Sequence, residues 1–158
     1  MIGYNAWRGA FPGLALAVLL AGSGRAQTTC VTLSESGGQT VYPVAVGDKV
    51  TLSFAHSIYG SQIQEEFRVV RRGFESGKLR YAELRLVEFY GHESAKQDND
   101  GWVVDNPGRH IPALELRVSQ VTSMRITVGA RGIVLRHSAA SGGRVRLTAG
   151  ACPRITYD

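Results

Sequence analysis

Apolar and polar residues alternate with a period of two along most of this chain. In chain order, the alternating segments cover residues 40–46, 50–56, 63–69, 114–118, 124–128, 133–135 and 145–147. Alternation of this kind puts successive side chains on opposite faces of a β-strand. Glycines and Asn–Asp or Asn–Pro pairs mark turns between the segments. The pattern therefore predicts an all-β fold, either an antiparallel β-sandwich or a Greek-key barrel.

Two segments break this alternation. In residues 78–90 the apolar positions start as Leu79 and Tyr81 and then change phase to Leu84 and Leu86. A β-bulge near Glu83 would produce the change, and so would a short helix over residues 82–89; we favour the bulged strand. Residues 92–109 are polar and rich in turn formers, which predicts one long loop where functional groups often lie.

The first 26 residues have the layout of a bacterial secretory signal. Arg8 precedes an apolar run over residues 10–21, and Gly24-Arg25-Ala26 supplies a small-x-small cleavage site. The apolar run is too short to span a bilayer as a helix. We therefore expect cleavage after Ala26 and a periplasmic or secreted protein. Residues 27–158 would form a single domain without a membrane span.

The two cysteines, Cys30 and Cys152, lie near the two ends of the predicted mature chain. An even number of cysteines in an exported protein is typical of a disulfide. A lipid anchor would need a small apolar run before Cys30, and residues 27–29 do not provide one. A reactive thiol is the other alternative, and we expect the disulfide.

Charge argues against nucleic-acid binding. The full chain has a formal net charge of +5, but Arg8 and Arg25 belong to the signal segment, which leaves about +3 for residues 27–158. The basic residues are scattered over the expected strands, whereas nucleic-acid sites concentrate them in a stripe with aromatic platforms. We expect no nucleic-acid partner.

One pair of polar residues falls on the apolar side of an expected hairpin. His56 shares a strand face with Leu52, and Glu65 shares a face of the next strand with Phe67. With residues 57–62 as the loop, the two side chains would lie near each other, since cross-strand β-carbons are about 5 Å apart. Such a pair could be a structural hydrogen bond or part of a pocket that binds a ligand or metal.

Further candidates lie in the expected long loop. His92 and His110 could join His56 around a ligand or metal, although no two of the four histidines, which include His137, have a short ligand spacing. Trp102 could anchor a ligand or partner, or could be an ordinary partly buried indole. No motif for a hydrolase elbow, a phosphate loop or a cofactor is present, so we expect no cofactor and no enzyme.

A family resemblance enters through the same hairpin. Residues 54–58, Phe-Ala-His-Ser-Ile, followed by residues 65–69, Glu-Glu-Phe-Arg-Val, resemble the small exported bacterial proteins of domain-of-unknown-function family 1850. Residues 90–91 and 100–102 are similar to later elements of that family. After Gly91 the chain departs from the family pattern, because His-Glu-Ser stands where small residues and proline are usual.

The resemblance implies a context but no mechanism. Members of this family are often encoded beside tripartite solute transporters of the TAXI-type TRAP class. The leading expectation is therefore a non-enzymatic accessory or binding module for periplasmic solute uptake. Its partner would be a solute-binding protein or a membrane subunit of the transporter. The alternative is a small-molecule or metal-binding protein, or a weak hydrolase, that uses His56 and Glu65; an envelope stability protein without a ligand is the third possibility.

Overall fold

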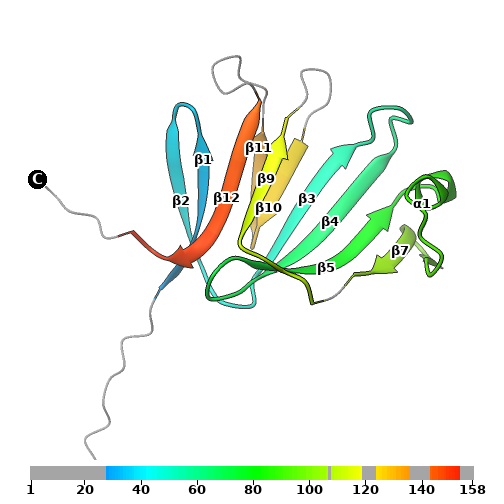
Figure 1. Ribbon diagram of the computed structural model, residues 1–158. Coiled ribbons are helices and arrows are strands. Elements are labelled where there is room, and N and C mark those ends of the chain that lie inside the picture. The colour runs from blue at the N-terminus through cyan, green and yellow to red at the C-terminus, as the bar shows by residue number, and fades with distance from the viewer. Residues whose placement is uncertain (1–27, 107, 119–123, 136–142, 154–158) are drawn as a thin grey trace, which may run out of the picture.

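Two antiparallel sheets form the protein, and the computed structural model describes residues 28–106, 108–118, 124–135 and 143–153 (Figure 1). The strands in chain order are β1 (Thr29–Glu35), β2 (Gly38–Val44), β3 (Lys49–Ala55), β4 (Gln62–Val69), β5 (Phe74–Tyr81), β6 (Lys96–Asp98), β7 (Gly101–Asp105), β8 (His110–Ile111), β9 (Ala113–Arg117), β10 (Met124–Val128), β11 (Arg131–Leu135) and β12 (Arg144–Ala151). One helix, α1 (Leu84–Phe89), follows β5.

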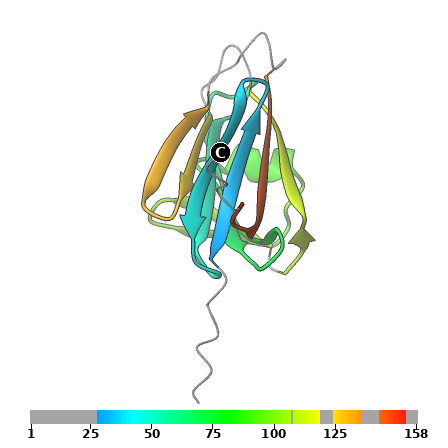
Figure 2. The ribbon, with the colours of Figure 1, turned by 90° about the vertical axis from the view of Figure 1, so that its left-hand side faces the viewer.

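The two sheets differ in width. The smaller sheet has the order β2-β1-β12-β9, and the larger sheet has the order β11-β10-β3-β4-β5-β7-β6, with β8 paired to β5. Figure 2, which views the molecule from the β2 side, shows the smaller sheet in front of the larger one. The expectation of an all-β sandwich is confirmed, and each of the segments with period-two alternation contributes to a strand.

The main core fills the space between the sheets. Its fully buried residues include Val31 and Leu147 from the smaller sheet and Val50, Val69 and Phe74 from the larger sheet. All of them come from alternate positions of their strands, because only one face of each strand points inward. Apolar burial on the facing sides of two sheets is therefore the main stabilising contribution to the fold.

The segment 78–90 is a strand followed by a helix, so the predicted bulged strand is wrong and the short helix is correct. β5 ends at Tyr81 and α1 begins at Leu84, which explains the change of phase in the apolar pattern. A six-residue helix is not stable by itself. Leu86 and Val87 bury their side chains with Ile63 in a second apolar cluster, and this contact holds α1 against the larger sheet.

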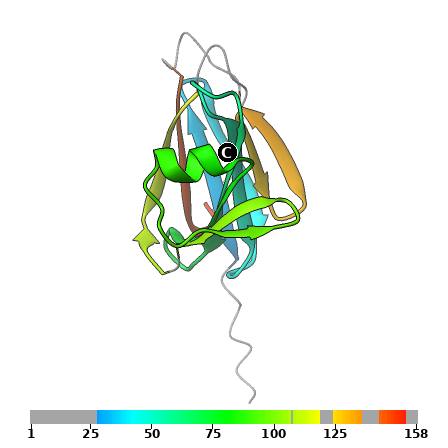
Figure 3. The same ribbon diagram turned by 90° about the vertical axis from the view of Figure 1, so that its right-hand side faces the viewer.

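The expected long loop is also corrected. Residues 96–105 form a hairpin of β6 and β7, which adds two strands to the edge of the larger sheet. Both strands are short; β6 is entirely polar and β7 has three consecutive apolar residues, so neither shows the alternation that marks the longer strands. Figure 3 shows α1 and this hairpin together at the end of the molecule opposite β2.

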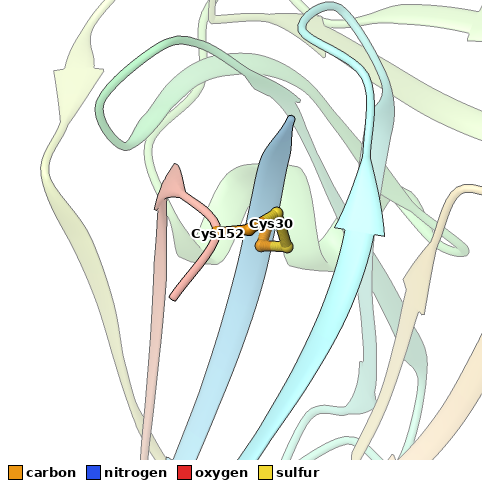
Figure 4. Close-up of a disulfide and its surroundings, with 2 residues drawn as sticks. All are labelled: Cys30 and Cys152. Atoms are coloured by element: carbon orange, nitrogen blue, oxygen red, sulfur yellow. A yellow bond between two sulfur atoms is a disulfide. The ribbon is translucent and has the colours of Figure 1, made fainter. Parts of the chain in front are cut away.

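Cys30 and Cys152 are disulfide-bonded, as expected, with their α-carbons 4.8 Å apart (Figure 4). Cys30 is buried in β1, whose neighbour β12 ends one residue before Cys152. The bond therefore joins the first described strand to the residue that follows the last one. The predicted signal segment lies outside the described residues, among which there is no helix long and apolar enough to cross a membrane.

Reduction of this disulfide should destabilise the protein strongly. The bond closes a loop with a sequence separation of 122 residues, and opening it restores conformational entropy to the unfolded chain. We expect the free energy of unfolding to fall by about 4 kcal/mol. Urea denaturation of the oxidised protein and of the Cys30→Ala/Cys152→Ala variant measures the difference. A loss below about 1 kcal/mol would contradict the expectation.

Candidate functional site

Glu65 lies between two separate apolar clusters on the inner face of the larger sheet. Its neighbours on the same face of β4 are Ile63, which belongs to the cluster under α1, and Phe67, which belongs to the main core. Phe54 on β3 packs against both clusters. The smaller sheet covers one part of this inner face and α1 covers the other (Figure 1). The carboxylate stands where one cover ends and the other begins.

A groove opens at this point. It has a volume of about 280 Å³. Its floor includes Leu52, Glu65 and Leu79 from the larger sheet, and one wall is β9, the outermost strand of the smaller sheet. A second cavity of about 250 Å³ is lined by Arg117 at the end of β9 and by His56.

Burial changes the acidity of Glu65. Desolvation raises the pKa of its carboxyl above the ordinary value, because the charged form loses hydration in the groove. Within the described part of the chain, no hydrogen-bond donor and no cation reaches this carboxylate. Burial is the main cause of the raised pKa of Tyr90, and the negative charge of Glu65 is the second cause. The same charge contributes less to the raised pKa of Tyr81. Lys78 and Arg109 also line the groove, but neither forms an ion pair with Glu65.

His56 is held inside the β3–β4 connection and is only 6% exposed. The N–H of Tyr59 donates a hydrogen bond to His56 Nδ1 at 3.3 Å, so Nδ1 is an acceptor and the neutral ring carries its proton on Nε2. The ring stacks on Tyr59 and meets the edges of Phe89 and Tyr90. Ser61 donates a hydrogen bond to Glu83 and so ties this connection to the start of α1.

His92 belongs to a neighbouring aromatic group. Its Nε2 shares a hydrogen bond with the Tyr81 hydroxyl at 2.8 Å, and its ring stacks on Tyr90. Burial, more than the nearby Tyr90 and Glu65, raises the pKa of Tyr81 to about 12. The hydroxyl thus stays protonated at neutral pH and can donate a hydrogen bond to His92 Nε2. Tyr90 contacts both His56 and His92, and it lines the second cavity together with His56.

The expected contact between His56 and Glu65 does not form. Gly60, with a φ of +68°, donates its N–H to the carbonyl of His56, and this tight turn pairs His56 with Ser61. The loop is shorter than the predicted one, so the register shifts and places Glu65 opposite Leu52. Both residues do face the apolar side, as expected. Instead of forming a pair, Glu65 lines the groove and His56 lines the second cavity.

The other candidates are dispersed. Trp102 is half-buried in β7 and packs into the cluster under α1, which matches the ordinary indole and not an exposed anchor. His110 lies in β8 and is exposed, with its Nε2 2.5 Å from the carbonyl oxygen of Arg72. His137 lies outside the described residues. The described part of the chain brings no three metal-ligating side chains together.

Sequence reasoning missed the groove itself. Phe54 and Tyr90 line the second cavity but are not among the expected site residues, although both lie inside the segments that resemble family 1850. The wall formed by β9 has no sequence signal, because an edge strand and a central strand can share the same alternation. Only the strand order shows that β9 is outermost.

The comparisons with known proteins found no relative. The chain matches no family model, no curated protein and no solved structure. The geometry of the site therefore carries the functional argument.

Glu65→Gln should stabilise the protein at neutral pH. The folded-state pKa of Glu65 is raised, so its ionisation weakens folding as the pH rises above the ordinary carboxyl value. We expect the variant to be more stable than wild type by up to about 1 kcal/mol at pH 7, and to lose this advantage near pH 4. Urea denaturation at both pH values measures it.

Glu66→Gln is the matched control for this prediction. Glu66 is the next residue along β4, but its carboxylate faces the other side of the sheet and lies 3.1 Å from Lys49 Nζ. It should show no stabilisation at neutral pH. An advantage of Glu65→Gln that is the same at both pH values would show that desolvation of the charge is not its cause.

Proposed function

We propose that this protein is an exported, non-enzymatic binding module whose ligand site is the groove at Glu65. The observation that carries the proposal is a half-buried carboxylate that has apolar clusters on both sides and forms no ion pair with any described residue. A charge that is left without a partner in a desolvated site costs free energy of folding. A ligand that brings a cationic group would recover that cost on binding.

The groove suits a ligand with apolar parts on either side of its cation. Phe67 and Leu114 lie on one side of Glu65, and Leu79 is the cross-strand neighbour of Glu65 on β5. Apolar walls with one oriented polar group are typical of binding pockets, because the walls supply affinity and the polar group supplies orientation. This arrangement supports binding more than catalysis.

A transporter remains the proposed partner. The resemblance of residues 54–58 and 65–69 to family 1850 supports a place beside a TRAP-type solute transporter, and the disulfide is compatible with export. The proposal combines the two: a periplasmic module that binds its ligand in the groove and acts with the uptake system.

Binding of n-butylammonium tests the groove. This probe combines a cation with a short apolar chain, and its neutral and anionic counterparts are 1-butanol and butyrate. We expect n-butylammonium to shift the backbone amide resonances of Leu79 and Leu114 in NMR spectra, and the other two probes to leave them in place. The response should disappear in Glu65→Gln and persist in Glu66→Gln. An equal response to 1-butanol would refute a site built around the carboxylate.

Cross-linking in native membranes tests the partner. We expect the protein to be recovered with a solute-binding protein or a membrane subunit of a transporter, identified by mass spectrometry. Recovery of other envelope proteins alone would refute the transporter link and would leave the groove proposal intact.

A further inference from the structure

One edge of β9 faces the groove with its backbone groups available. The N–H of Val118 donates to the carbonyl of Gly143 at 2.6 Å, which fixes the hydrogen-bonding phase of β9 with β12. Antiparallel pairing alternates, so Ala113, Glu115 and Arg117 direct their N–H and C=O groups toward the other edge. Among the residues that the structure describes, no strand pairs with that edge.

Two cavities, the groove and the second cavity, together follow β9 from Ala113 to Arg117. The first cavity is lined by Ala113 to Leu116, and the second is lined by Arg117. On the floor, the first cavity lies over Leu52 and the second over Phe54 and His56. Five residues of β-strand span about 17 Å. A site that is long, narrow and bounded by a strand edge fits an extended polypeptide.

The floor presents an alternating pattern to such a polypeptide. Phe67 comes first, with Leu114 of the β9 wall beside it, the Glu65 carboxylate comes next, and Phe54 with the His56 ring comes last. Alternate side chains of an extended strand point to one face, about 7 Å apart. An apolar, a basic and an apolar side chain at alternate positions would match this floor.

We infer that the ligand is an extended segment of a partner protein, which adds to the free edge of β9 as a fifth strand of the smaller sheet and places a lysine or arginine over Glu65. This inference rests on the proposed function, because it uses the same groove and the same carboxylate. Backbone hydrogen bonds to Ala113, Glu115 and Arg117 hold the segment, and the charge of Glu65 selects its sequence.

A second copy of this chain matches the floor less well. If the β9 strands of two copies paired at this edge, the incoming strand would present Leu114 and Leu116 to the inner face and would bring no cation to Glu65. The exposed edge of β2 has the sequence Gly-Gln-Thr-Val-Tyr-Pro-Val and contains no basic residue. Charge complementarity therefore favours a basic segment from another protein.

The experiment uses the oxidised protein and the peptide acetyl-Thr-Val-Thr-Lys-Thr-Val-Thr-amide. Its valines and lysine lie on one face of the extended chain. We expect saturable binding by NMR titration, with slower hydrogen exchange at the amides of Ala113 and Glu115. Replacement of the peptide lysine by glutamine should weaken binding at least about fivefold, as expected for loss of a charge pair in a partly desolvated site. In Glu65→Gln the two peptides should bind equally.

A variant of β9 isolates the backbone contribution. Glu115→Pro removes the one N–H at the centre of the free edge, and proline is tolerated on an edge strand when its nitrogen faces outward. We expect peptide binding to fall at least about tenfold in this variant. Glu115→Gln keeps the N–H, loses the ion pair with Arg146 and should bind normally. If Glu115→Pro fails to fold, a peptide N-methylated at its central threonines gives the same test on wild type.

The outcomes separate this inference from the proposed function. If n-butylammonium binds through Glu65 but the peptide does not bind, the ligand is a small cation; the inference is then overturned and the binding module stands. If neither binds, both fall. Equal binding of the lysine and glutamine peptides, or binding insensitive to Glu115→Pro and to N-methylation, overturns strand addition. A concentration-dependent dimer that the peptide cannot dissociate would assign the edge to a second copy.

Discussion

The larger sheet is wider than the four-stranded sheet that packs against its inner face. The apolar side chains that the smaller sheet leaves uncovered must still be shielded from water. The chain meets this requirement with a second cover, the helix α1, whose Leu86 and Val87 seal the far part of the face. Two covers of different geometry leave a seam between them. Glu65 and the free edge of β9 both lie at that seam, so the candidate site is a direct result of the mismatch in sheet width.

Position along one strand decides the properties of Glu65. Ile63, Glu65 and Phe67 face the same side of β4, yet the first and last are buried in separate clusters while Glu65 is only half-buried. The carboxylate is therefore desolvated enough for its pKa to rise, and open enough to meet a ligand. Glu66, one residue further along, faces the opposite side and pairs with Lys49. Adjacent carboxylates thus have different chemical roles because of the pleat alone.

The sequence carried most of the fold but little of the site. The alternation of apolar and polar residues located the long strands, because burial of one face dominates strand sequences. The same alternation correctly placed His56 and Glu65 on the apolar side. The pairing of these two residues depended on the length of one loop, and the positive φ of Gly60 shortened that loop and shifted the register. α1 was ambiguous because six residues hold too few turns for a clear helical period. The order of strands in a sheet depends on long-range contacts that no local pattern records.

An exposed strand edge beside uncovered apolar surface is a template for unwanted association, including stacking of identical chains. The carboxylate of Glu65 lies on the floor under that edge, so an indiscriminate apolar strand would have to bury a charge in order to pair with β9. The side chain proposed to select a basic ligand therefore also disfavours pairing of this edge with apolar strands of neighbouring molecules. Glu65 would therefore limit association between copies of the protein, in addition to the recognition role proposed for it.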